Sequence, residues 1–591
     1  LKCIIKILFM QHKPSPTKHL WLTLAAMFWL GNCFAGWSPD TIAVVEQPAV
    51  IDTSVNNGIG AGINGGLQLS NVFYHTSLDT AYRSPLSYII SGQFNLSWKK
   101  ITLPFSFILS EQERNFRQPF NQFGASPQYK WVTIHAGYRN ITFSPYTLAG
   151  HTFLGGGVEL NPGKLRFAAI YGRFTKAVHP DSVLILPGQS AYDRYALSVK
   201  LGVGKATNYF DVMYLKGWDN PNAIINVTDT SIARPASNSV LGFTLHQQMG
   251  KHFLLKLTTA ASVFTNDINS SEVEATDKGV IKLIDAFNVN TSTQFHYAVD
   301  GSFGYTGNNF GIGAAYKRIS PDYKSMGVYF VTNDVEQYTL IPSVNLWKRK
   351  IRLGGSVGFE HDNLAANRSF QTERVIGSAN VSINPSPVFG ITGNYYNYSI
   401  GQIQGIKQLN DTIRLAQVNR GITITPRITL GKKQLRHMVL FTYDTRNLDD
   451  KNVYTATYTE YQTSTQFINY AITHIDKGYT ITLSANNNAI KSEVVNTSYR
   501  GGSVGVSKSF YKNTLNVSVN GGYNIIAQTI DGGGNMLNYN TNISYRFFKK
   551  HLVSLFGYSN IFNSATATIP SYTDYTFRLQ YQYSFAKKSI L

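Results

Sequence analysis

The stretch from Tyr575 to Phe585 reads YTFRLQYQYSF, and its pattern decides the fold. Its odd-numbered positions carry large apolar or aromatic side chains: Tyr575, Phe577, Leu579, Tyr581, Tyr583 and Phe585. The even-numbered positions carry Thr, Arg, Gln and Ser. Because β-strand side chains alternate with a period of two, the two sets lie on opposite faces of one strand. The sequence therefore predicts a strand with one apolar face and one polar face.

The same alternation recurs along the rest of the chain. It is clear in 86–98, 195–203, 351–359, 479–485 and 515–525. The polar positions of these segments hold mainly Ser, Thr, Asn, Gln and Gly, which suit contact with water. A soluble sandwich of this size would need bulky residues on the face that is small and polar here. We therefore expect the apolar faces to contact lipid and the polar faces to line a lumen.

Short basic turns alternate with longer polar connections between these strands. Lys99-Lys100 and Lys549-Lys550 are short turns, whereas 111–127 and 265–290 are long connections. Short turns at one end and long loops at the other are typical of outer-membrane barrels, and counting between the turns gives about 26 strands, in a range of roughly 22 to 26. The predicted fold is all-β, a transmembrane antiparallel up-and-down β-barrel.

The first 35 positions have the layout of a secretory leader. Basic residues precede the apolar run Leu20–Leu30, and the small residues Ala35-Gly36 follow it. The sequence predicts a signal peptide at 1–35, a periplasmic N-terminal segment at 36–61, the barrel at 62–585 and a C-terminal tail at 586–591. Both cysteines, Cys3 and Cys33, lie in the leader, so disulfide and thiolate chemistry are not expected in the mature chain.

The formal net charge of +20 would suggest a nucleic-acid partner in a soluble protein. Here the basic residues gather in short turns, and an exported barrel does not meet nucleic acid. We expect these side chains to contact water and the headgroups of outer-membrane lipids, with no nucleic-acid partner.

The densest unusual stretch is 119–174, where charged residues stand among glycines and aromatics. Its candidate lumen or partner contacts are Lys130, His135, Arg139, His151, Glu159, Arg166 and Arg173. Within it, Gly155-Gly156-Gly157 permits sharp bending or close backbone approach. One interpretation is an infolded loop that narrows the lumen or contacts a partner. The other is an ordinary run of hairpins in which glycine relieves crowding.

The final strand resembles the assembly signal of outer-membrane barrels, which alternates aromatic residues and ends in Phe. In that resemblance Phe585 is the terminal aromatic, and the residues from Ala586 to Leu591 depart from the pattern. The whole mature chain also resembles the large outer-membrane barrels of Bacteroidota in its Tyr- and Asn-rich strands and basic turns. The resemblance implies the barrel-assembly machinery as a partner and names no activity.

Motifs of known enzymes are missing from the sequence. The His-x-Ser-Asn-Gly run of barrel phospholipases and a phosphate-binding Gly-rich loop with its Lys are both absent, and the histidines are scattered singly. We therefore predict no enzyme, no cofactor and no metal. The predicted function is a polar channel or transport pore in the outer membrane of a Gram-negative bacterium. The alternative is a non-conducting barrel that serves an export, assembly or surface-attachment complex through a protein partner in the outer membrane or periplasm.

Overall fold

The structure is a computed structural model that describes residues 61–589 without 82, 112–120, 179–190, 224–233, 274–288, 405–414, 432–433 and 530–531. The predicted signal peptide and nearly all of the predicted N-terminal segment lie outside the described residues. The described residues belong to one compact unit, Gly58–Leu591. Its short helices are η2 (Pro221–Ala223) and α4 (Ala456–Thr459). Among these residues, no helix is long and apolar enough to cross a membrane.

Strands make up most of this unit. The first group is β1 (Ala61–Thr76), β2 (Leu86–Trp98), β3 (Ile101–Ser110), β4 (Gln122–Ala125), β5 (Gln128–Tyr129), β6 (Val132–Asn140), β7 (Leu148–Ala149), β8 (Thr152–Leu160), β9 (Leu165–Thr175), β10 (Arg194–Lys205), β11 (Asn208–Asp219), β12 (Ser237–Met249), β13 (Phe253–Thr265), β14 (Thr293–Thr306) and β15 (Phe310–Ile319). The second group is β16 (Gly327–Val328), β17 (Val335–Leu346), β18 (Ile351–His361), β19 (Phe370–Ile383), β20 (Phe389–Gln404), β21 (Ala416–Gly431), β22 (Leu435–Asp450), β23 (Tyr461–His474), β24 (Tyr479–Lys491), β25 (Thr497–Phe510), β26 (Leu515–Gln528), β27 (Gly534–Phe547), β28 (His551–Ser564) and β29 (Tyr572–Ser589).

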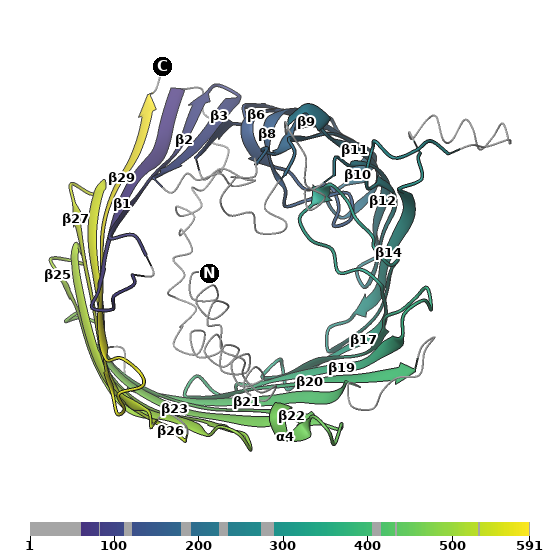
Figure 1. Cartoon of the computed structure of the whole chain (residues 1–591). Coiled ribbons are helices and arrows are strands. Elements are labelled where there is room, and N and C mark those ends of the chain that lie inside the picture. Colours follow the sequence, from purple (N-terminus) through teal and green to yellow (C-terminus); the bar gives the residue numbers. More distant parts are fainter. Residues whose placement is uncertain are drawn as a thin grey trace. The chain divides into compact units, whose positions relative to one another are not determined.

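One antiparallel sheet closes on itself, because β1 pairs with β2 on one side and with β29 on the other. The sheet contains 27 strand segments. Since β4 and β5 follow one another in the same position between β3 and β6, these segments form a barrel of 26 strands. The predicted up-and-down antiparallel barrel is therefore confirmed, and Figure 1 shows its ring of strands.

The two faces of the wall differ in chemistry as the alternation predicts. Large apolar side chains are exposed on the outer face, for example Tyr171, Leu201 and Phe577. The inner face carries hydroxyl and amide groups, such as Ser484, which is 2.6 Å from Ser503. A closed sheet satisfies its own backbone hydrogen bonds, and an apolar outer band suits hydrocarbon. The barrel therefore spans a membrane with a polar lumen.

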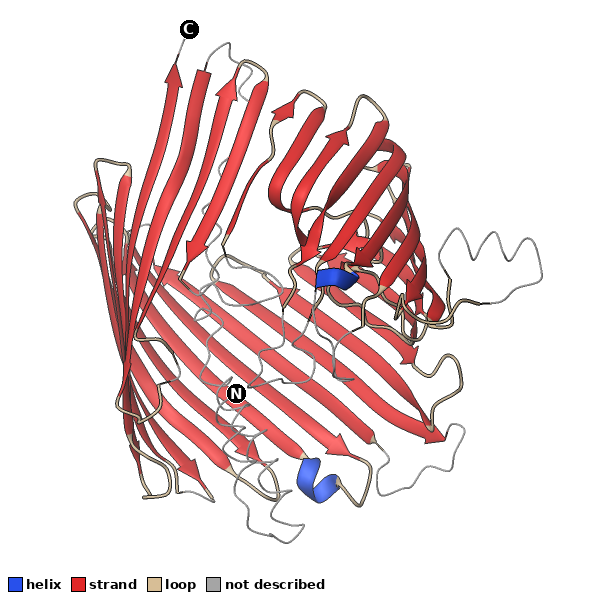
Figure 2. Ribbon diagram, turned by 45° about the horizontal axis from the view of Figure 1, so that its top comes forward, coloured by secondary structure: helices blue, strands red, loops and turns tan. Residues whose placement is uncertain are grey.

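Four inward-facing glycines let part of the wall bend sharply. Gly124, Gly137, Gly155 and Gly172 stand opposite one another on β4, β6, β8 and β9. A Cβ atom on Gly155 would lie 2.1 Å from the carbonyl oxygen of Tyr171. Gly137 also has a φ of +89°, which a side chain disfavours. Figure 2 shows the tighter curl of the wall on the side that carries η2.

The strand position formed by β4 and β5 is interrupted at Ser126 and Pro127. Pro127 and Pro104, which stands on β3 opposite Ser126, have no N–H to donate to the ladder. The remaining backbone bonds run from Ser126 N to Pro104 O at 3.0 Å and from Ile134 N to Pro127 O at 2.9 Å. Side chains reinforce the wall at this break: the guanidinium of Arg139 on β6 donates to the Ala125 carbonyl at 3.3 Å and to Ser106 Oγ on β3 at 3.2 Å.

The last strand does not end at Phe585, as the tail predicted at 586–591 would require. β29 continues to Ser589, and residues 586–589 pair with β1 from Asn64↔Ala586 to Ala61↔Ser589. Phe585 stands opposite Gly65 of β1, and its ring lies 5.7 Å from the ring of Phe94 on β2. The two rings thus meet over a glycine at the closing strand, an arrangement that strengthens pairing next to glycine.

Replacing Phe585 with Ala is expected to weaken closure of the barrel. The variant loses the ring that covers Gly65 and its stacking with Phe94, a pair worth about 1 kcal/mol beyond burial. We expect a smaller fraction of folded barrel, measured as the heat-sensitive band shift on a gel and as yield in the membrane. Tyr575→Ala, ten residues earlier on the same outer face, is the matched control, because its ring stands opposite His75 and Ser559 and not opposite a glycine. Equal yields of the two variants would contradict a special role for Phe585.

Candidate functional site on the inner wall

Two connections fold onto the inner side of the wall and join there. They are residues 141–151, between β6 and β8, and residues 320–334, between β15 and β17; together we name them the luminal double loop. Their short strands β7 and β16 pair in parallel through Leu148↔Gly327 and Ala149↔Val328. In Figure 1 this pair lies inside the ring, beside β10 and β12. Within the stretch 119–174, the segment that folds inward is 141–151, and β6 and β8 on either side of it are strands of the wall.

The double loop is held by an apolar core built against small residues of the wall. Leu148 and Tyr323 are almost completely buried at its centre. The wall residues that face it are small or aliphatic: Ala196, Leu215, Val240, Ala260, Ala298 and Ile319. A Cβ atom on Gly242 would lie 2.5 Å from Thr147 Cγ2, so the wall leaves room for the loop only because glycine stands there. Close packing of this kind makes the double loop a fixed part of the lumen.

Hydrogen bonds fasten the two connections to each other and to the wall. Tyr323 donates its hydroxyl to the Tyr146 carbonyl at 2.8 Å, and Ser325 donates to the Thr147 carbonyl at 2.7 Å. Tyr146 in turn donates to Asp300 Oδ2 on β14 at 3.0 Å. Burial raises the pKa of both Tyr146 and Tyr323, which keeps these hydroxyls protonated as donors.

His151 lies inside the double loop, away from the open lumen. Its ring stacks on Tyr329 with centroids 4.1 Å apart and lies 4.8 Å from the ring of Phe174. Burial lowers the pKa of His151 to about 4, so the imidazole is neutral near pH 7. It therefore serves as a packing side chain.

Three other predicted residues are separate from one another. Lys130 sits in the exposed turn between β5 and β6, with its ammonium 5.1 Å from the Tyr129 ring. Arg166 points into the lumen and forms a bidentate pair with Asp211, at 2.7 and 2.9 Å. Arg173 shares the outer face with Tyr171 and lies 3.7 Å from Asp193.

His135 and Glu159 are brought together, and a residue that the sequence analysis did not single out joins them. His135 Nε2 lies 2.9 Å from Glu159 Oε1, and His135 Nδ1 lies 2.9 Å from Ser126 Oγ. His135 is on β6, Glu159 is on β8, and Ser126 is at the break between β4 and β5. All three alternate with outward residues such as Ile134, so they face the lumen. Among the described residues, no cluster of His, Cys, Asp and Glu is arranged to hold a metal ion.

Sequence reasoning also missed residues 320–334. Their letters, SPDYKSMGVYFVTND, read as a polar connection with a few apolar residues. The only hint is the apolar content of a segment that would otherwise be exposed, since Tyr323 and Met326 become buried.

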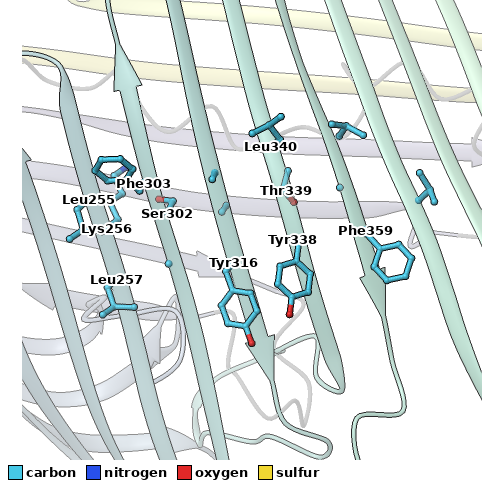
Figure 3. A pocket seen from close by; sticks show the side chains of 16 residues that line it. Leu255, Lys256, Leu257, Ser302, Phe303, Tyr316, Tyr338, Thr339, Leu340 and Phe359 are labelled. Carbon is cyan, nitrogen blue, oxygen red and sulfur yellow. The ribbon is translucent and has the colours of Figure 1, made fainter.

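The outer wall carries an apolar groove of about 750 Å³ across β13–β19. Leu257, Phe303, Tyr316, Tyr338 and Phe359 rise around it in Figure 3, and the small residues Gly301 and Ala314 leave it open. The hydroxyls of both tyrosines donate to Glu336 Oε1 at 2.8 Å. Because the groove belongs to the lipid-facing side, it suits hydrocarbon and is separate from the lumen.

No family model and no curated protein match this chain. Among solved structures, it is similar to OpdQ of Pseudomonas aeruginosa, with 10% identity and a TM-score of 0.30 over 72% of this chain and 98% of that one. The P pilus usher (PapC) translocation pore matches with 8% identity and a TM-score of 0.32 over 89% and 99%. The FrpB iron transporter from Neisseria meningitidis matches with 9% identity and a TM-score of 0.35 over 88% and 81%. The barrel assignment rests on the strand pairing.

Proposed function

We propose that this protein is a transport pore for polar solutes in the outer membrane of a Gram-negative bacterium. The observation that carries the proposal is that one part of the inner wall is covered by the double loop, whereas the rest of it is open and polar. The luminal double loop covers inner residues of strands between β8 and β17. The inner faces of the later strands present hydroxyl and amide pairs, such as Ser356 with Ser378 at 2.7 Å and Asn486 with Asn524 at 3.2 Å. Such a face exchanges hydrogen bonds with water and with polar solutes.

In this proposal the double loop narrows the aqueous path through the barrel. Four of the residues predicted as lumen contacts line this path: His135, Arg139, Glu159 and Arg166. His135 pairs with Glu159 and Arg166 pairs with Asp211, whereas the guanidinium of Arg139 bonds to neutral oxygens of Ala125 and Ser106. We expect weak selection between small cations and anions. Lipids around the apolar band and the barrel-assembly machinery remain proposed partners, and a Bacteroidota origin remains a proposal.

Conductance of the purified full chain in a planar lipid bilayer tests the proposed function. We expect stepwise currents and a reversal potential close to zero in a salt gradient. A protein that is folded by the gel-shift criterion but gives no current would contradict the pore. A co-purifying protein in that case would point to the non-conducting barrel of an outer-membrane complex.

A further inference from the structure

The side chains of Ser126, His135 and Glu159 are joined by two consecutive hydrogen bonds, in the order found around an activated serine. The two distances are both 2.9 Å, and the residues come from three neighbouring positions of the wall. A hydroxyl in contact with a base, and a base in contact with an orienting carboxylate, is an arrangement that activates serine nucleophiles.

The tautomer of His135 follows from its partners. An ionised Glu159 can only accept, so the proton of the neutral imidazole must reside on Nε2. Nδ1 then carries the lone pair, and the Ser126 hydroxyl must donate to it. The ring is thus prepared to take the Ser126 proton, while Glu159 stabilises the imidazolium that results. His135 is 8% exposed, which limits rotation of its ring out of this position.

The surroundings of Ser126 add a fixed positive charge and an irregular backbone. Ser126 lies where β4 has ended and β5 has not begun, and its exposure is intermediate. The guanidinium of Arg139 lies over Gly124, where a Cβ atom would come within 2.9 Å of its Cζ. Gly124 precedes Ser126 by two residues on the same face, a spacing of about 7 Å along a strand. A carbonyl oxygen placed between them would develop its negative charge near Arg139.

We propose that Ser126 is a catalytic nucleophile that hydrolyses small carboxylic esters in the lumen. Ser126 Oγ attacks the carbonyl carbon, and its proton moves to His135 Nδ1. The bond to the alkoxy oxygen breaks, and the departing alcohol takes that proton. Water then attacks the acyl-Ser126 ester, gives its proton to His135 Nδ1 and releases the carboxylic acid, while Oγ regains a proton. The net reaction is ester plus water to acid plus alcohol.

A fluorophosphonate probe and p-nitrophenyl acetate test this proposal on the folded full chain in detergent. We expect one covalent adduct on each chain, mapped to the peptide that contains Ser126. The adduct and the ester hydrolysis should disappear in Ser126→Ala. In His135→Gln labelling should be roughly 100-fold slower, which is the scale of general-base assistance. Glu159→Gln should also slow labelling, whereas Glu159→Asp should restore part of the rate.

Ser484→Ala is the matched control, because Ser484 also faces the lumen but bonds to a serine and not to a histidine. It should label and hydrolyse like the unaltered protein. An unlabelled but folded protein, or equal labelling of Ser126→Ala, would overturn the proposal and leave the three residues as a brace across the interrupted strand. Conductance does not depend on this result, so the pore and the nucleophile fail separately.

Discussion

Undocking the luminal double loop is expected to raise the single-channel conductance several-fold. Gly327→Val is the sharpest substitution for this purpose. A Cβ atom at Gly327 would lie 2.3 Å from the Thr147 carbonyl oxygen and 2.5 Å from Leu215 Cδ1. The paired backbone of Thr147 cannot move far enough to relieve this overlap, so the pairing of β7 with β16 must break. The inner wall that the loop covered would then line a wider aqueous path, measured in a planar bilayer.

Gly304→Val is the control for this experiment. Gly304 lies on β14, where an added Cβ atom would meet only ordinary contacts at 3.8 Å. We expect its conductance to match that of the unaltered protein.

Replacing 142–150 with a short turn gives a second way to open the lumen. The excision must leave β6 and β8 intact, because both are wall strands. A conductance unchanged in Gly327→Val and in the excised variant would contradict a narrowing role for the double loop.

Gly155→Val is expected to prevent most molecules of the protein from assembling into a closed barrel. Its Cβ atom would lie 2.1 Å from the Tyr171 carbonyl oxygen and 2.5 Å from the Cα of Gly172. Both are backbone atoms of the neighbouring strand, so relief requires the wall to flatten where it bends. Overpacking costs about 1–3 kcal/mol and occasionally more, and here the conflict also opposes the curvature that closes the sheet. The folded fraction is read from the heat-sensitive gel shift after refolding.

Gly156→Val, one residue along, is the matched control. Gly156 points outward, and its added Cβ atom would lie 3.4 Å from the His135 carbonyl oxygen, an ordinary contact. Valine also suits a lipid-facing position of a strand. We expect near-normal folding of this variant. Similar loss in both variants would contradict inward crowding at the bend as the reason for the glycine at 155.

Strand identity and the facing of side chains could be predicted because both are local. The alternation from Tyr575 to Phe585 depends only on the two-residue period of a strand, whatever the strand pairs with. The basic turns, such as Lys99-Lys100, depend on a few neighbouring residues. Together they were sufficient for the strand count and the antiparallel order. The end of the last strand was misplaced because residues 586–589 are held by their partner β1, and their own pattern does not show this.

The candidate sites could be predicted only in part, because they depend on register between strands. His135 and Glu159 stood out as charged residues in a glycine-rich stretch, but nothing local distinguishes Ser126 from other serines. Its partner is decided by the shared register of β4, β5 and β6, which sets Ser126 beside His135. His151 shows the converse: its sequence context suggested a lumen contact, and packing against Tyr329 makes it a buried neutral ring.

The sequence by itself determined that this chain is a membrane-spanning barrel with a polar interior, because alternation and turn chemistry are properties of neighbouring residues. Only the tertiary structure decided which segments of the chain occupy the lumen. Residues 141–151 and 320–334 are far apart in the chain, and each acquires its apolar core from the other and from the wall. Their place in the lumen therefore depends on assembly of the barrel. Burial of Leu148 and Tyr323 stabilises the two segments only after the strands between them have assembled.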